Sequence, residues 1–459
     1  MINLNSINLS DINLGGIDLS EISLGLSSGT DISNKWYGVE WDKTVQNPAV
    51  TRIGNISLQK SLPIQSLMRR CLLLDDGTVN YYLDANNSSL KEDGTPGNLD
   101  GSDGQVMVEI PAHYRKFESE DNIQRVKISR YPISGFHRVE KAYRSAYEAT
   151  VQRSTQKLSS VVNTTADYRG GANHHSFDGT YKSMLGMPAT AISLTNFRKY
   201  ARNRGTYGKN NAGWNCDVYE IQKTCYWLYV IEYANRDSQL PFDASLTPEG
   251  FKLGGLSAGA TTLSSSKWSA LNGYYPFIPC GTTNPLGNNT GIVEFTMPDE
   301  YDPGVVFKVN VPSYRGIENP FGHTWSWTDG CKCTIQRNEA GVESVFYVSD
   351  DPGGFQDTNF EGYESRGLLP KDSGYVKDIM IATGENMPSV VGGGSTVYFC
   401  DYFYTSIPAS GTSERGVLFG GSADGGAYAG LACACANGAP SYTLAAVGSR
   451  LCFIPATTR

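Results

Sequence analysis

The chain has 459 residues, of which 50 are glycine and 27 are tyrosine, and its formal net charge is -8. A chain of this length is too long to fold around one ordinary hydrophobic core, so we expect two or three domains. The acidic balance and the lack of a basic tract argue against nucleic acid as a partner. No apolar run reaches the roughly 18–20 residues of a membrane span, so we expect no membrane insertion. The first residues also lack the features of a signal peptide, and we therefore expect synthesis in a cytoplasm.

Ten cysteines and five histidines are scattered along the chain. The tight cysteine pairs, Cys331/Cys333 and Cys433/Cys435, are Cys-x-Cys motifs rather than the Cys-x-x-Cys of a zinc ribbon. We therefore predict free, mostly buried thiols and expect no cofactor. A structural metal is the alternative that the composition leaves open.

The N-terminal segment alternates isoleucine and leucine with a period of five, from Ile2/Leu4 to Ile22/Leu24. This period fits neither an α-helix nor a long flat strand, and it resembles the pentapeptide repeats of a square β-coil. The ten side chains bury too little to offset the entropy of ordering the segment, so it should fold only against copies of itself or another chain. We predict that residues 1–30 form a stalk for attachment or trimerisation; the alternative is a flexible tail.

Residues 31–130 are predicted to be a β-rich connector domain. Cys71–Leu74 and Val79–Leu83 flank an Asp-Gly pair, which is typical of a β-hairpin, and Gln105–Ile110 is the next expected strand. Three aspartates lie in glycine-rich loop sequence between these strands, but their spacing does not match a calcium-binding EF-hand loop. We expect solvated turns at these three positions: Asp93, Asp100 and Asp103.

From about residue 131 the pattern becomes helical. Glu140–Lys157 and Ser193–Arg204 are predicted helices, the second ended by Gly205 in a left-handed cap. A third helix is predicted over Val218–Ala234, with Asp217 and Glu220 as a capping box and an apolar stripe facing the core. Strand-like runs such as Gly304–Val311 follow. We therefore expect an α+β domain over residues 131–459.

Two C-terminal stretches are the most distinctive part of the chain. The first is Gly322-His323-Thr324-Trp325-Ser326-Trp327, and the second runs from Arg415 through Gly420-Gly421 to Gly448–Phe453. In this order they resemble the C-type-lectin-like fold in its formylglycine-generating-enzyme-like variety. The final segment, with the 131–236 region before it, also resembles variable proteins diversified by retroelements, notably tail proteins of phages that infect gut bacteria. The expected fold class is thus α+β, with a C-type-lectin-like domain after the connector and the repeat stalk.

The resemblance also implies structural roles for several residues. Paired tryptophans would pack beneath the ligand face, two arginines would brace the fold through backbone carbonyls, and two glycines would permit close backbone approach. These residues are Trp325, Trp327, Arg415, Arg450, Gly420 and Gly421. His323 stands where the family has asparagine, and we expect it to be a hydrogen-bonded scaffold residue rather than a base.

The segment between these anchors has an unusual composition, because 20 of the 29 residues in Gly420–Gly448 are Gly, Ala, Ser or Cys. Small side chains between core strands with large apolar side chains suit a surface whose sequence varies freely. This agrees with the resemblance to proteins diversified by retroelements. Tyrosine gives such a surface a large amphipathic contact at low entropic cost and suits sugar rings as well as proteins. By position, the candidate ligand-binding residues are Tyr402, Tyr404, Ser422, Asp424, Ala427, Tyr428, Asn437, Ser441, Tyr442 and Thr443. The alternative is that the tyrosines are ordinary half-buried strand residues.

These features predict a receptor-binding protein at the tip of a phage tail fibre, which recognises a bacterial surface protein or glycan through residues of about 400–450. We expect a homo-oligomer, in particular a homotrimer, that joins other tail-fibre proteins through residues 1–30 and gains avidity from several copies. It would be part of the virion and made in the host cytoplasm. One alternative is a structural virion or cell-surface component without its own receptor. The other is a formylglycine-generating-type enzyme, but the residues around Cys433 and Cys435 do not match that motif, and we predict no catalytic activity.

Overall fold

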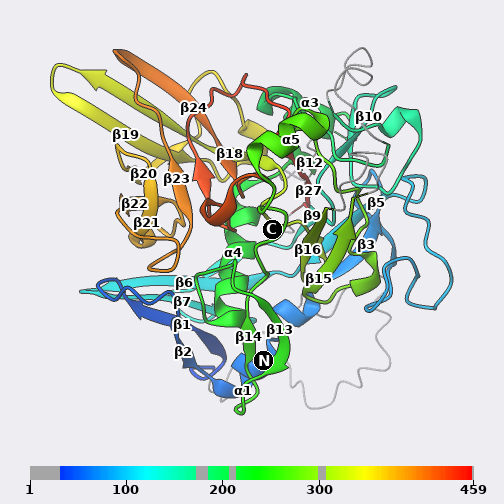
Figure 1. Ribbon diagram of the computed structural model, residues 1–459. Helices are drawn as coiled ribbons and strands as arrows, with labels where there is room; N and C mark the ends of the chain where they lie inside the picture. The colour runs from blue at the N-terminus through cyan, green and yellow to red at the C-terminus, as the bar shows by residue number, and fades with distance from the viewer. Residues whose placement is uncertain (1–31, 172–184, 206–212, 298–306, 457–459) are drawn as a thin grey trace, which may run out of the picture.

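The computed structural model describes residues 32–171, 185–205, 213–297 and 307–456 (Figure 1). The predicted stalk of residues 1–30 lies outside these ranges. Within the described residues the structure is mostly β, with 38% in strands, 14% helical and four α-helices. The predicted α+β class with a C-type-lectin-like domain is therefore wrong. None of the helices in the described ranges has the length and apolarity needed to cross a bilayer.

The first sheet is a five-stranded antiparallel sheet built mainly from the N-terminal part of the described chain. Its strand order is β2-β1-β7-β6-β8. The strands are β1 (Trp36–Asp42), β2 (Thr51–Gly54), β6 (His113–Glu120), β7 (Ile123–Ser129) and β8 (His137–Val139). The short helix α1 (Ile56–Ser61) follows β2, and its N-cap residue Asn55 accepts hydrogen bonds from the Ser57 and Leu58 nitrogens.

A six-stranded sheet joins strands that are far apart in the sequence, in the order β12-β27-β9-β5-β3-β4. The strands are β3 (Arg69–Leu73), β4 (Val79–Tyr82), β5 (Gln105–Ile110), β9 (Ala142–Ser145), β12 (Gly213–Cys216) and β27 (Leu451–Ile454). The predicted hairpin (β3 and β4) and the predicted strand over Gln105–Ile110 are confirmed. Strands from both sides of residue 130 pair in this sheet, so that position does not separate two sheets.

The largest sheet has nine strands and carries most of the C-terminal part of the chain. Its order is β20-β19-β18-β24-β25-β23-β21-β22, and β26 pairs with β18. The strands are β18 (Trp325–Asn338), β19 (Gly341–Val348), β20 (Glu364–Leu368), β21 (Gly374–Ile379), β22 (Pro388–Val391), β23 (Tyr402–Tyr404), β24 (Gly411–Phe419), β25 (Ala434–Cys435) and β26 (Val447–Ser449). The two motifs singled out in the sequence meet here, because β18 pairs with β24 and β26.

Three smaller sheets complete the strands. They comprise β10 (Thr150–Gln152) with β11 (Lys157–Ser159), β13 (Phe242–Leu246) with β14 (Lys252–Gly254), and β15 (Gly291–Thr296) with β16 (Lys308–Tyr314) and β17 (Ile317–Glu318). The helix predicted over Glu140–Lys157 is wrong, because β9 and β10 are strands and the buried residues 146–149 between them form a bend. Its apolar residues are buried on both faces of the chain, and this produced the apparent helical period.

The long helix α4 (Tyr219–Tyr233) runs through the centre of the molecule between the five-stranded and nine-stranded sheets (Figure 1). Fourteen of its 15 residues are buried, because the helix is surrounded by core on all sides and has no solvent-facing side. The predicted helix is confirmed, but the capping box is wrong. Val218 is the N-cap and makes no side-chain cap, while the Asp217 carboxylate forms a buried ion pair with Arg144 at 2.6 Å.

Two further helices lie beside the sheets. The helix α3 (Leu194–Arg202) confirms the helix predicted over Ser193–Arg204, and the structure shows Ser193 as its N-cap. Its C-cap is Asn203 in the right-handed region, so the predicted left-handed cap at Gly205 is wrong. The helix α5 (Ser265–Asn272) was not predicted and ends at Gly273 with φ of 66°.

Candidate functional site

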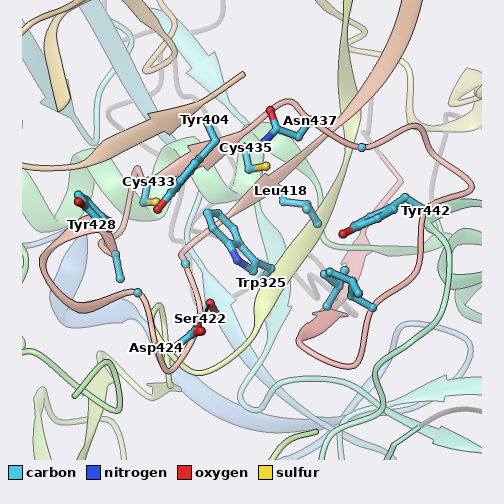
Figure 2. Close-up of a pocket in the computed structure, with 16 residues that line it drawn as sticks. Trp325, Tyr404, Leu418, Ser422, Asp424, Tyr428, Cys433, Cys435, Asn437 and Tyr442 are labelled. Atoms are coloured by element: carbon cyan, nitrogen blue, oxygen red, sulfur yellow. Dashed lines mark hydrogen bonds between the residues drawn. The ribbon is translucent and has the colours of Figure 1, made fainter. Parts of the chain in front are cut away.

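An open cavity of about 510 Å³, here called the aromatic cavity, lies where β18, β23, β24 and β25 come together. Figure 2 shows Trp325 near its middle, with Tyr404, Tyr428 and Tyr442 arranged around it. These side chains come from distant parts of the chain. Trp325 begins β18 and Tyr404 ends β23. Tyr428 and Tyr442 lie before and after β25, in the segment Gly420–Gly448 that is rich in small residues. The pairing of β18 with β24 and β26 brings the pieces together.

Six of the ten predicted ligand-binding residues line the aromatic cavity. They are Tyr404, Ser422, Asp424, Tyr428, Asn437 and Tyr442. Tyr402 does not line the cavity, but its ring lies 4.6 Å from each of the rings of Tyr404 and Tyr428, measured between centroids. Three predicted residues are exposed beside the lining residues without being among them: Ala427, Ser441 and Thr443. Their role as ligand contacts stays a prediction.

Tyr375, which no sequence pattern marked, completes an aromatic cluster at the cavity. Its ring centroid lies 5.1 Å from that of Tyr402 and 5.5 Å from that of Tyr428. Tyr375 reaches this place because it stands opposite Tyr402 in the antiparallel pairing of β21 with β23. It lies outside the C-terminal segment with the unusual composition, so no local signal marked it.

The rim of the cavity exposes large apolar side chains. Tyr428 is 46% exposed, Tyr442 is 41% exposed and Leu444 is 49% exposed. Exposed apolar side chains that gather around one cavity mark interaction sites more often than scattered ones do. The rim is therefore suited to contact with another molecule.

The charge of the aromatic cavity comes from one residue. The exposed Asp424 carboxylate accepts a hydrogen bond of 2.8 Å from the Ser422 hydroxyl, which orients it. Burial raises the pKa of the Tyr404 hydroxyl and of the Cys433 thiol, and it raises the pKa of Cys435 to about 11. These groups are neutral at neutral pH, so Asp424 makes the cavity acidic.

The turn that carries Tyr428 is held from the interior by side chains of other elements. Gln239 donates from its amide to the carbonyls of Gly426 (3.1 Å) and Ala429. The next residues are also fixed, because the Leu431 carbonyl accepts a bond of 2.7 Å from Gln222. Such contacts fix the turn before any ligand arrives, which lowers the entropy lost on binding.

The residues with expected structural roles differ in their burial and in their hydrogen-bond partners. Trp327 is wholly buried, two positions along β18 from Trp325. The guanidinium of Arg450 donates to the carbonyls of Glu318 at 2.6 Å and Asn319 at 2.5 Å. The Nε atom of Arg415, in contrast, is buried and has no hydrogen-bond partner within the described residues.

His323 lies in the interior and not at the cavity. Its Nε2 atom accepts bonds from the nitrogens of Phe277 (3.2 Å) and Ile278 (3.3 Å), so Nδ1 carries the proton and donates to Glu148 at 2.5 Å. Burial acts to raise the pKa of Glu148, but the His323 contact and a bond from Thr324 hold it below its usual range. His323 therefore connects three segments of backbone, as a scaffold residue does.

The two cysteine pairs and the other thiols show no arrangement for metal binding. All ten cysteines are free, and nine of them are buried. Within the described ranges no group of three or more His, Cys, Asp or Glu side chains is placed to hold a metal ion. Asp93 and Asp100 instead cap turns by accepting from the nitrogens of Thr95 and Ser102, at 2.9 Å each, and the Asp103 carboxylate accepts from the Tyr81 hydroxyl at 2.8 Å.

Comparisons with known proteins identify no family. No model of a protein family matches the chain, and no curated protein matches it. Among solved structures, a chain described as "Major Tropism Determinant I1 Variant" is 11% identical, over 88% of this chain and 89% of that chain. The TM-score of 0.21 is too low for this likeness to support an argument about the fold or the function.

Proposed function

We propose that this protein is a receptor-binding protein of a phage tail fibre, which contacts a bacterial surface protein or glycan through the aromatic cavity. The observation that carries the proposal is an open cavity of about 510 Å³ whose rim exposes Tyr428, Tyr442 and Leu444. A concave, mainly apolar site with a few placed polar groups is the usual form of a binding site. Attachment to a tail fibre rests on the sequence resemblance, and trimerisation rests on the repeat of residues 1–30.

The chemistry of the cavity favours binding over catalysis. Its cysteines are poor nucleophiles, because burial raises the pKa of both thiols and the thiolate is the reactive form. Among the described lining residues Asp424 is the one carboxylate and no histidine or lysine accompanies it, while burial raises the pKa of the Tyr404 hydroxyl and makes that group a weak acid. A formylglycine-generating activity through Cys433 and Cys435 has no support in this arrangement.

The proposal is tested by binding of the labelled full chain to intact candidate host cells. We expect the double variant Tyr428→Ala/Tyr442→Ala to remain folded and to lose cell binding, because it removes two exposed aromatic side chains from the rim. The matched control is Tyr131→Ala/Leu246→Ala, which removes two other exposed apolar side chains, 48% and 52% exposed. Equal loss in both variants, or full binding by the rim variant on a host that the wild type binds, would contradict the proposal.

A further inference from the structure

We infer that the aromatic cavity receives a cationic side chain, an arginine or a lysine, from a protein on the bacterial surface. This inference rests on the proposed function and specifies the chemistry of its ligand. It follows from three properties of the cavity: the orientation of its aromatic rings, the position of its single charge, and the lack of a cation among its lining residues.

The aromatic rings meet at nearly right angles. The ring planes of Trp325 and Tyr404 form an angle of 81° with their centroids 5.7 Å apart, and those of Tyr404 and Tyr428 form 82° at 6.4 Å. Rings in this arrangement present their negatively polarised faces in more than one direction. A cation near such faces is attracted by more than one ring.

The chain already holds one of its own cations in this way. The Lys332 ammonium lies 4.4 Å from the ring centroid of Phe360 and 4.0 Å from that of Tyr363. That lysine also donates a hydrogen bond to the Gln356 carbonyl at 3.1 Å. The aromatic cavity offers the same combination of ring faces and oxygen acceptors, but its own residues supply no cation.

The acceptors of the cavity match a guanidinium or an ammonium group. The Asp424 carboxylate is exposed and is oriented by Ser422 at 2.8 Å, and the Asn437 amide also lines the cavity. A guanidinium carries five N–H donors in a planar fork that fits a carboxylate and stacks on aromatic rings. A neutral sugar would stack on the rings but would leave the negative charge without a complement, and an anion would be repelled.

Among the residues that the structure describes, no lysine, arginine or histidine lines the cavity. The nearby Arg415 lies on β24, where Leu418 lines the cavity. Residues 415 and 418 are an odd number of positions apart, so their side chains point to opposite faces of the strand. The Arg415 charge still reaches the Cys435 thiol, where it acts to lower the pKa, but Arg415 does not line the cavity, so Asp424 has no cationic partner among the described lining residues.

The test compares how tightly the full chain binds two peptides of the same shape, with a neutral sugar as a third ligand. Ligand-observed NMR titration would use Ac-Gly-Arg-Gly-NH2, its citrulline analogue, in which a neutral urea replaces the guanidinium, and methyl α-mannoside. We expect the arginine peptide to bind about ten-fold more tightly than the citrulline peptide, as a charge-assisted contact implies. Asp424→Asn should abolish this preference and Asp424→Glu should restore it. Glu339→Gln, at an exposed carboxylate on the turn between β18 and β19, should leave it unchanged.

Equal binding of the two peptides, tighter binding of the mannoside, or a preference that survives Asp424→Asn would overturn the inference. The cell-binding assay distinguishes a failure of the cationic-ligand inference from a failure of the proposed receptor-binding function. Loss of cell binding in both the rim variant and Asp424→Asn supports the two together. Loss only in the rim variant keeps the proposed function and rejects the cationic ligand, whereas retention in both variants rejects both.

Discussion

The Oδ2 atom of Asp401 accepts a hydrogen bond of 3.0 Å from the Ala432 backbone nitrogen and thereby connects two walls of the aromatic cavity. Asp401 immediately precedes Tyr402 and β23, and Ala432 follows the turn that carries Tyr428. Asp401 is 2% exposed, and burial raises the pKa of its carboxyl well above the usual value. The two walls are therefore connected by a carboxyl group whose neutral form is favoured by burial.

Asp401→Asn should stabilise the protein at neutral pH. A raised pKa means that the folded state binds the proton more tightly than the unfolded state, so the stability contributed by Asp401 falls as pH rises from about 3.9 to the folded pKa. A pKa raised by one costs about 1.4 kcal/mol at neutral pH. Asparagine avoids the charge, and its oxygen still accepts from the Ala432 nitrogen. Thermal unfolding should show a higher Tm for the variant at pH 7.5 and a smaller difference at pH 4.5. A Tm gap that does not change with pH would contradict this reasoning.

Glu148→Gln should have the opposite pH signature. The pKa of Glu148 is held below its usual range, so the stability it contributes is present above the unfolded value of about 4.3 and is lost as pH falls through the lowered folded value. At pH 7 the variant loses a charged hydrogen bond with His323, which costs about 1.5–3 kcal/mol. Urea unfolding at pH 7 and pH 3.5 measures both effects. A variant as acid-sensitive as the wild type would assign the acid transition to other carboxylates.

Trp325→Ala and Trp327→Ala should separate binding from stability. Trp327 is wholly buried in the core, so its truncation should cost about 3–5 kcal/mol in the free energy of unfolding. Trp325 is only partly buried and lines the cavity, so its truncation should cost less and should abolish binding of the arginine peptide in a folded protein. Denaturant unfolding and the peptide titration test this pair. Equal destabilisation by the two changes would show that Trp325 is a core residue.

Local signals predicted the parts of the fold that depend on local chemistry. The Asp-Gly pair before Val79 correctly predicted a hairpin, and the helix predicted to start at Ser193 begins one residue later. The segment around Tyr143 was misread, because burial on both faces of a strand removes the period of two on which strand prediction relies. Tyr375 was missed, because its place opposite Tyr402 is set by pairing between distant strands. Six cavity residues were found since they share one short segment of unusual composition and its neighbouring strand.

Gly421→Ala should disturb the cavity through its backbone, and Gly426→Ala is the matched control. Both glycines have positive φ, 80° and 53°, so each substitution carries a left-handed strain of about 1–2 kcal/mol. A Cβ at Gly421 would lie 2.7 Å from the Ala429 Cβ, whereas a Cβ at Gly426 would meet no atom within 4 Å. The added clash at Gly421 should displace the turn that carries Tyr428 and weaken binding of the arginine peptide and of cells. Gly426→Ala should lower stability only slightly and leave binding intact; a similar loss of binding in both variants would attribute the effect to strain rather than to the contact with Ala429.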